Sequence, residues 1–419
     1  MNLSHRAVGA ALVATLTLSG ASTGHADGRR EWSGAWAGAQ HRPWHNEWDG
    51  PNWSLGGFAD QSIRQVVRIT TGGTRVRVRL SNRYGTRPLR VGGATVAKTG
   101  DGARVRPGTM RRLTFGGSPE ATIPAGRDAI SDAASLVTAP LERLTVTLYL
   151  TRPTGPATFH EGGMTTTYRA GGNHVSDAGA DAFAGETSHS WYYLTGVDVT
   201  GGRPRGAVAA FGDSITDGFG STPGADNRYP DELAERLAAA GTPRGVLNAG
   251  INGNMLLTDS SCAAGEKALA RFGRDALDRP AVRAVVVLLG TNDIGLGGLD
   301  FGCGEFPEVT ARRLIAGHRA LIRMAHARGV TVIGATVTPF KPAQPYYSTT
   351  HEAVRTGLNR WIRHSGEYDA VVDLDRVLAE PADPQRLRTA YDSGDHLHPN
   401  DAGTRAIAAA IDLTLRRTR

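Results

Sequence analysis

Between about residue 31 and residue 200, apolar and polar residues mostly alternate along the chain. Segments 75–80 (RVRVRL) and 144–150 (LTVTLYL) show this period of two most clearly. Strict alternation is the pattern of a half-buried strand, with one face in the core and the other in water. Turn-forming clusters rich in glycine separate such segments, at residues 71–73, 82–85, 116–119 and 171–173. With no long helical pattern between them, the sequence predicts an antiparallel β-sandwich domain of jelly-roll type over residues 31–200.

The rhythm changes after the Gly-Gly-Arg-Pro segment at 201–204, which we interpret as a hinge. Short apolar segments now alternate with amphipathic ones. The apolar run 282–289 indicates a central parallel strand that is buried on both faces. Further strands are expected at 207–211, 246–249, 330–337 and 371–374, and helices at 230–240, 308–328, 350–364 and from Asp401 onward. Such alternation predicts a doubly wound α/β/α parallel sheet, flavodoxin-like, in a second domain at residues 205–419.

The first 26 residues have the layout of an export signal. A weakly positive start precedes a short apolar stretch at 7–18, and small residues at 24 and 26 suit cleavage after Ala26. The alternative interpretation is an ordinary N-terminal helix. We expect a signal peptide at residues 1–26 and a secreted, extracellular protein.

Charge and composition narrow the function classes. The chain has 47 basic and 40 acidic residues, for a formal net charge of +7. Only three residues are lysines (Lys98, Lys267 and Lys341), and the arginines are scattered rather than gathered into one run. This pattern argues against a nucleic-acid partner. No apolar run reaches the roughly 20 residues that a membrane span needs, so no span is expected.

Four short polar motifs in the second region stand out. Gly-Asp-Ser-Ile at 212–215, Asn-Ala-Gly-Ile-Asn-Gly-Asn at 248–254 and Gly-Thr-Asn-Asp at 290–293 follow three expected strands. Asp-His-Leu-His-Pro at 395–399 comes just before the last helix. Sites of doubly wound sheets lie beyond the carboxyl ends of the strands, so these motifs are expected to converge.

Their residue types suit nucleophilic catalysis. A serine hydroxyl is a weak nucleophile that needs a nearby base, and Ser214 and His398 are the candidates. Asp395 can hold the other ring nitrogen of the histidine if the segment makes one helical turn. The backbone N–H groups of Ser214 and Gly253, with the side-chain amide of Asn292, would form an oxyanion hole. Glycine at 253 lets the backbone approach the substrate.

These residues resemble the four blocks of the SGNH/GDSL hydrolase superfamily, which is named for its Ser, Gly, Asn and His. Ser214, Gly253, Asn292 and the Asp395/His398 pair match the blocks in order, over roughly residue 207 to the C-terminus. Ile215 stands where the superfamily usually has leucine. The whole chain also resembles secreted two-domain actinobacterial members that carry an N-terminal β-sandwich. The resemblance implies a carboxylic ester hydrolase of the esterase or lipase type.

Several of these residues also have structural explanations. Ser214 can cap a helix, and Asn292 with Asp293 can form a turn. His396 is assigned a structural role, and the aspartates Asp213, Asp217 and Asp293 are expected to brace loops. No His, Cys or Asp cluster has metal-ligand spacing, so neither a metal nor a cofactor is expected. No serine after the expected signal peptide lies in Gly-x-Ser-x-Gly, which argues against the α/β-hydrolase elbow.

Two further features belong to no block. Five tryptophans crowd into residues 32–53, and they serve either as core and interdomain packing or as an aromatic platform for sugars or acyl chains.

Cys262 and Cys303 are the only cysteines, and export would place both in an oxidising compartment. Both follow strand ends on the same edge of the sheet, so we expect a disulfide that closes a loop of about 41 residues, worth roughly 4 kcal/mol.

The sequence thus predicts a secreted, monomeric serine esterase that acts on a small-molecule or polysaccharide ester. Two alternatives remain open. The same site could transfer the acyl group to an alcohol, or the chain could be a carbohydrate-binding protein with a relict site.

Overall fold

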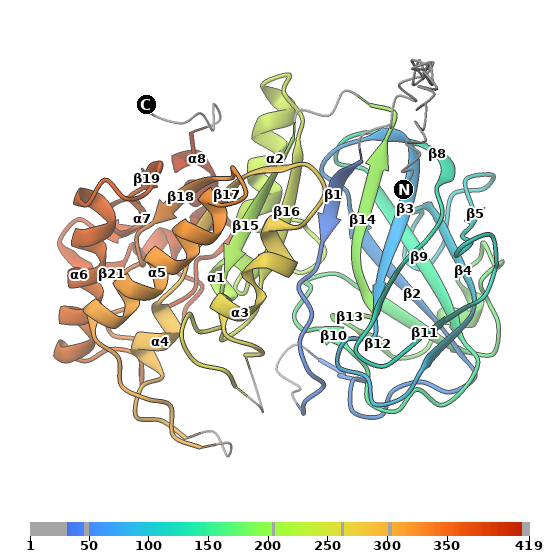
Figure 1. Cartoon of the computed structure of the whole chain (residues 1–419), viewed down its shortest axis with the longest axis horizontal. Coiled ribbons are helices and arrows are strands. Elements are labelled where there is room, and N and C mark those ends of the chain that lie inside the picture. The colour runs from blue at the N-terminus through green and yellow to red at the C-terminus, as the bar shows by residue number, and fades with distance from the viewer. Residues whose placement is uncertain (1–31, 46–49, 203–205, 261–263, 301–303, 413–419) are drawn as a thin grey trace, which may run out of the picture. The chain divides into compact units, whose positions relative to one another are not determined.

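The computed structural model describes residues 32–45, 50–202, 206–260, 264–300 and 304–412 (Figure 1). These described residues form one compact unit. The expected signal peptide, Trp48, the disulfide partners Cys262 and Cys303, and part of the expected hinge lie outside the described residues, so those expectations stay predictions, as do the domain boundaries. No helix in the described ranges is long and apolar enough to cross a membrane.

Residues 33–200 form two main antiparallel sheets, consistent with the β-sandwich that the alternating pattern predicts. One sheet has the order β1-β14-β3-β7, with β8 also paired to β3; the other has the order β12-β11-β2-β9-β4-β5, with β6 paired to β4. β10 and β13 form a separate two-stranded sheet. The strands are β1 (Ser33–Ala37), β2 (Gln61–Arg68), β3 (Gly73–Ser81), β4 (Leu89–Lys98), β5 (Arg111–Arg112), β6 (Ala121–Ile123), β7 (Asp128–Ile130), β8 (Ala134–Thr138), β9 (Arg143–Leu150), β10 (Phe159–His160), β11 (Thr167–Gly171), β12 (Thr187–Ser188), β13 (Trp191–Tyr192) and β14 (Leu194–Thr200).

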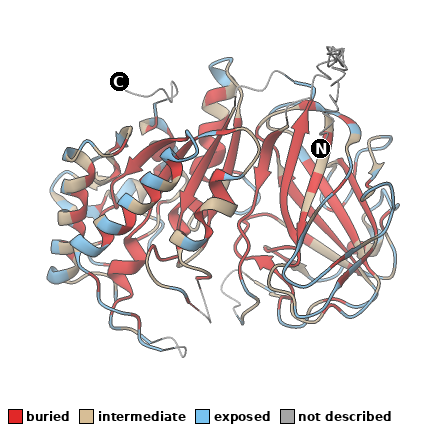
Figure 2. Cartoon of the chain, viewed as in Figure 1, coloured by how far each residue is buried: buried red, intermediate tan, exposed pale blue. Residues whose placement is uncertain are grey.

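Alternate residues of both sheets meet in one core, which includes Val76, Val78 and Leu80 of β3 (Figure 2). Trp36 and Trp53 are buried in this core, which supports the packing explanation for these two rings. The Trp44 indole instead donates a hydrogen bond from Nε1 to the carboxylate of Glu161 (3.1 Å).

Residues 207–372 hold a five-stranded parallel sheet in the order β16-β15-β17-β18-β19, as the strand–helix alternation predicts. Its strands are β15 (Ala207–Gly212), β16 (Gly245–Gly250), β17 (Val282–Leu288), β18 (Thr331–Ala335) and β19 (Ala370–Val372), and a hairpin of β20 (Ala379–Glu380) and β21 (Asp383–Leu387) follows. The helices are α1 (Ser214–Asp217), α2 (Tyr229–Ala239), α3 (Ala268–Phe272), α4 (Thr291–Gly295), α5 (Ala311–His326), α6 (Thr349–His364), α7 (Leu374–Val377) and α8 (Asp401–Ala410).

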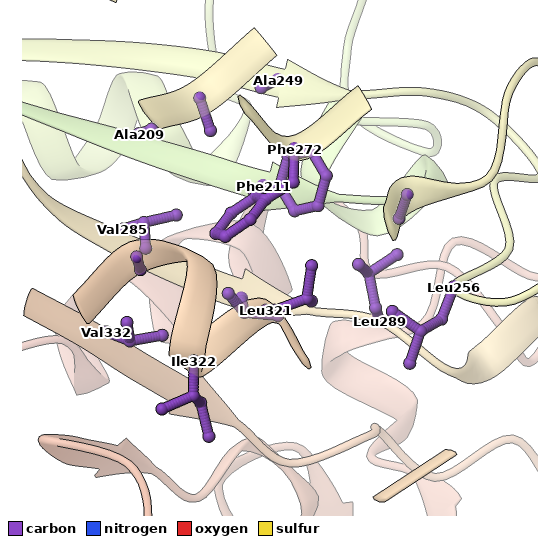
Figure 3. Packing of buried hydrophobic residues seen from close by; sticks show 14 of the residues in the cluster. Ala209, Phe211, Ala249, Leu256, Phe272, Val285, Leu289, Leu321, Ile322 and Val332 are labelled. Atoms are coloured by element: carbon purple, nitrogen blue, oxygen red, sulfur yellow. The ribbon is translucent and has the colours of Figure 1, made fainter. Parts of the chain in front are cut away.

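Strand residues point alternately to the two faces of this sheet, and each face has its own helical cover. Phe211 and Val285 pack with Phe272 of α3 and Leu321 of α5 in the cluster that Figure 3 shows. On the opposite face, α1, α2, α7 and α8 cover the sheet. The carboxyl ends of the strands are left for the loops that form the site.

The expected helix at 308–328 is shorter in the structure, where α5 begins at Ala311 and ends at His326. The Thr310 hydroxyl accepts a hydrogen bond from the backbone N–H of Arg313, and this cap fixes the start of the helix. Gly329, with φ near +66°, turns the chain away after its end.

The antiparallel and parallel parts contact each other along β1 and β16 (Figure 1). The Thr70 hydroxyl accepts a hydrogen bond from the backbone N–H of Val246 (2.8 Å) and donates one to the backbone carbonyl of Ala35 in β1 (2.8 Å). A Cβ on Gly245 would lie 2.0 Å from the carbonyl oxygen of Gly34, so the backbones approach too closely for any larger residue there.

Candidate active site

Ser214 stands at the sharp turn from strand β15 into the short helix α1. The Asp213 side chain caps this helix by accepting a hydrogen bond from the backbone N–H of Ile215 (3.1 Å). Gly218, with φ +113°, ends it after four residues. The serine therefore lies at a helix N-terminus beyond the carboxyl end of a central strand, where the first N–H groups have no partner within the helix.

The structure brings Ser214, His398 and Asp395 together in one line of hydrogen bonds. The Ser214 hydroxyl lies 2.8 Å from Nε2 of His398, and Nδ1 of the same ring lies 2.5 Å from Oδ2 of Asp395. His398 comes from the loop before α8, 184 positions from the serine. This is the geometry of a nucleophile, a base and a carboxylate that orients the base.

The link between Asp395 and His398 is not the helical turn that their spacing suggested. The segment bends instead, and Oδ1 of Asp395 accepts hydrogen bonds from the backbone N–H groups of Leu397 (2.9 Å) and His398 (2.8 Å). An aspartate side chain readily replaces a backbone acceptor in this way. Pro399 also disfavours a helical conformation of the residue before it.

Asp395 is held as an ion although its side chain is 40% exposed. Burial would raise the pKa of this carboxyl, but hydrogen bonds from the side chain and backbone of His398 and from the backbone of Leu397 outweigh it. The net result is a pKa well below the usual range for aspartate. Asp395 therefore stays a carboxylate throughout the range in which an imidazole gains or loses its proton.

The three expected oxyanion donors come from the ends of three neighbouring strands. Ser214 follows β15, Gly253 follows β16 on one side, and Asn292 follows β17 on the other. Gly253 has φ +71°, a left-handed conformation that favours glycine. Asn292 is 2% exposed and lies in the first turn of α4.

Two hydrogen bonds fix the amide of Asn292. Its Oδ1 accepts one from the hydroxyl of Tyr346 (2.8 Å), and its Nδ2 donates one to the backbone carbonyl of Asn254 (3.1 Å). Because an amide nitrogen carries two protons, one N–H stays available for a substrate oxygen. The sequence analysis did not single out Tyr346.

Arg271 holds the loop after β16 in place. It is a buried residue that the sequence analysis also missed. Its guanidinium donates to the carbonyls of Gly212 (2.7 Å) and Ala249 (2.7 Å), at the ends of β15 and β16. It also donates to Oδ1 of Asn254 (2.9 Å). One buried cation therefore ties together the two strand ends that carry Ser214 and Gly253.

Two more buried carboxyls support the loops, as the sequence analysis expected. Asp293 accepts hydrogen bonds from the backbone N–H groups of Leu256 (2.7 Å) and Leu257 (2.9 Å), and burial nevertheless raises its pKa to about 6. Burial, reinforced by the charge of Asp293, raises the pKa of Asp213 to about 7. The hydroxyl of Ser214 is instead hydrogen-bonded to His398.

Two residues near the base complete the site. His396 forms a separate pair with Asp392, 2.6 Å from Nδ1 to Oδ2, and it has no contact with Ser214. The ring of Phe219 packs against the His398 imidazole, with 4.5 Å between ring centres, and the sequence analysis missed it. Among the described residues, no three His, Cys, Asp or Glu side chains gather as a metal site would require.

Comparison with known proteins identifies a family for the α/β part. Residues 210–406 match the GDSL-like Lipase/Acylhydrolase family. This match spans all four blocks, and it identifies the α/β part of the chain as a hydrolase domain of the SGNH/GDSL superfamily.

Solved structures resemble about half of the chain. A lipase/acylhydrolase from Enterococcus faecalis is 20% identical, with 50% of this chain and 93% of that chain covered and a TM-score of 0.38. An aryl esterase from M. smegmatis is 17% identical, with 49% and 95% covered and a TM-score of 0.39. A carbohydrate acetylesterase family member from Sinorhizobium meliloti is 17% identical, with 49% and 94% covered and a TM-score of 0.38. No curated protein matches the chain.

Proposed function

We propose that the chain is a secreted serine esterase that hydrolyses carboxylic esters through an acyl-enzyme on Ser214. The observation that carries this proposal is the hydrogen-bonded line from the Ser214 hydroxyl through His398 to Asp395, with distances of 2.8 and 2.5 Å. The match to a lipase/acylhydrolase family supports the same class of reaction.

In the first half of the reaction, Nε2 of His398 takes the hydroxyl proton as the Ser214 oxygen attacks the ester carbonyl carbon. Asp395 holds Nδ1–H of the ring and stabilises the imidazolium that forms. The tetrahedral intermediate then collapses, and His398 gives the proton to the departing alkoxide. An alcohol leaves, and the acyl group stays on the serine.

The negative charge on the carbonyl oxygen is met by the N–H groups of Ser214 and Gly253 and by the free N–H of Asn292. These donors are held in place before substrate binds, so they need no reorganisation in the transition state. Tyr346 and Arg271 keep the donor-bearing groups in position through the hydrogen bonds described above.

In the second half, His398 takes a proton from water, and the resulting hydroxide equivalent attacks the acyl-enzyme. The acid leaves, and Ser214 recovers its proton. An alcohol in place of water would make the same site an acyltransferase. Product analysis with and without an added acceptor alcohol separates the two reactions.

The direct test is hydrolysis of chromogenic esters by the wild-type protein and by Ser214→Ala. We expect turnover by the wild type and a loss of nearly all of it in the variant, with unchanged folding. A fluorophosphonate probe that reacts with serine nucleophiles should label the wild type alone. Absence of both turnover and labelling would instead favour a binding protein with a relict site. A series of acyl chain lengths on one leaving group then defines the substrate class.

A further inference from the structure

A buried hydrogen-bonded pair joins the antiparallel part of the chain to the helix that begins with Ser214. Nε2 of His160, in β10, lies 2.9 Å from Oδ1 of Asp217, the last residue of α1. The two side chains are only 3% and 1% exposed. Asp217 is three residues from Ser214 in a helix of four, so the position of its carboxyl and that of the serine are coupled.

The contacts of His160 determine how many protons the pair carries. Nδ1 of the ring lies 2.6 Å from the backbone carbonyl of Ala39, which can only accept a hydrogen bond. Nδ1 must therefore carry a proton. The hydrogen bond between Nε2 and Asp217 needs a second proton, which sits on one of the two partners. The pair is then neutral overall, whichever partner holds that proton.

The surroundings favour keeping this shared proton. Burial raises the pKa of Asp217, and its Oδ2 has no hydrogen-bond partner in the part of the chain that the structure describes. For His160, burial alone would lower the pKa, but Asp217 and the Ala39 carbonyl outweigh it and the net shift is upward. The opposing charges are Arg228, which faces both groups, and Arg271, which faces Asp217.

Neither arginine replaces the histidine as a partner of Asp217. Arg228 is bound to Asp231 (2.6 Å), and Arg271 makes the backbone contacts described above. The third neighbouring titratable group is His41, whose pKa burial lowers to about 3, so its ring is neutral. His160 is therefore the group that compensates the buried Asp217 carboxyl.

The rest of α1 is held tightly from the other side. The Asn248 side chain donates to the backbone carbonyl of Asp217 (3.1 Å), and a Cβ on Gly250 would lie 2.3 Å from the backbone nitrogen of Asp217. The helix is thus clamped on β16, and His160 supplies the contact from the antiparallel part. Loss of that contact leaves a buried, unpaired carboxyl, and movement of α1 is one way in which the strain is relieved.

We propose that His160 is a positioning residue: the proton that it shares with Asp217 ties the antiparallel part to α1 and so sets the place of Ser214. This inference rests on the proposed esterase function. It assigns the antiparallel part a role in positioning the nucleophile. It also predicts that activity falls at alkaline pH, when the shared proton dissociates.

The test compares four variants in the full-length secreted protein: His160→Ala, Asp217→Ala, Asp217→Asn and His326→Ala. His326 is the matched control, because its Nε2 also lies 2.9 Å from an aspartate oxygen (Asp369), on a partly exposed pair remote from α1. The measurements are kcat and KM on a chromogenic ester and the rate of fluorophosphonate labelling of Ser214, at neutral and alkaline pH, with the thermal unfolding temperature of each variant.

We expect His160→Ala and Asp217→Ala to lower kcat and the labelling rate by about 10- to 100-fold at little change in KM, since a small displacement of the nucleophile is costly. His326→Ala should behave as wild type. In Asp217→Asn, the amide donates to Nε2 of His160 without a titratable proton. This variant should recover most of the activity lost in Asp217→Ala and should lose the alkaline decline caused by the pair.

Wild-type kcat and labelling in a folded His160→Ala protein would overturn the inference. If His160→Ala does not fold, the test is the comparison of Asp217→Asn with the wild type. An alkaline decline in activity that is the same in both proteins would also overturn the inference. A wild-type protein that neither turns over esters nor reacts with the probe refutes the proposed function instead, which separates the two failures.

Discussion

The hydroxyl of Tyr346 donates a hydrogen bond of 2.8 Å to Oδ1 of Asn292. Burial raises the pKa of this tyrosine above its ordinary value, so the hydroxyl stays protonated and acts as a donor. A Cβ on Gly295 would lie 1.9 Å from the tyrosine ring, which shows how closely the ring packs on α4. The amide oxygen of Asn292 is thereby held toward Tyr346, and its nitrogen lies toward the backbone carbonyl of Asn254.

We therefore expect Tyr346→Phe to lower kcat by about 3- to 10-fold with KM unchanged, because one hydrogen bond of roughly 1 kcal/mol no longer orients the amide. Tyr347→Phe is the matched control, since its hydroxyl contacts Gln385 (2.8 Å) instead of Asn292. Steady-state kinetics of both variants check this. In an Asn292→Ala background, Tyr346→Phe should add nothing, and two independent losses would refute the positioning role.

Asn292→Ala should lower kcat by about 10²- to 10³-fold with little change in KM. A donor that meets the oxyanion more strongly than the ground-state carbonyl acts mainly in the transition state. The measurement is again kcat and KM on a chromogenic ester, with thermal unfolding as a control for folding. A raised KM at constant kcat would assign Asn292 to substrate binding.

Ser214→Ala and His398→Ala should each remove nearly all turnover, and the double variant should be little worse than either single variant. The hydroxyl and the base act as one unit, so once either is absent the other no longer contributes to turnover. If the fold-losses in kcat of the two single variants multiply in the double variant, the two residues do not act as one unit.

Asp213 should make the stability of the protein depend on pH. Its folded pKa of about 7 lies above the unfolded value near 3.9, so the native state holds the proton more tightly. The resulting stabilisation is complete below about pH 4 and is lost as the pH rises through 7.

Asp213→Asn removes this dependence while keeping an oxygen to cap Ile215. The free energy of unfolding in urea, measured at pH 4 and pH 8, should show the variant gaining on the wild type by a few kcal/mol at the higher pH. Two parallel pH curves would show that Asp213 does not titrate in this range.

The sequence predicted the layers of the fold because each has a strong periodic signal. The apolar run at 282–289 becomes β17, and the alternating run at 75–80 lies inside β3. Helix ends were predicted less well, since the Thr310 cap decides where α5 begins. The bend between Asp395 and His398 was also missed, because a side-chain acceptor replaces the helical hydrogen bonds there.

The residues that approach the Ser214 hydroxyl could be predicted because each lies in a short local motif. The supporting residues could not, because their contacts join distant positions without a local pattern. Tyr346 and Asn292 are 54 positions apart, and His160 and Asp217 are 57 apart in different sheet systems. The role of Arg271 likewise could not be predicted, because its guanidinium binds the ends of two separate strands, β15 and β16.

The central claim is that Ser214 carries an acyl group during turnover, and trapping that species tests it most directly. The protein is mixed with a p-nitrophenyl acyl ester, quenched in acid within the first turnover, digested and examined by mass spectrometry. We predict one acyl group on the peptide that contains Ser214, formed together with a burst of nitrophenol, and neither in His398→Ala. Steady hydrolysis with Ser214 unmodified at every quench time, or an acyl group on another residue, would contradict the account.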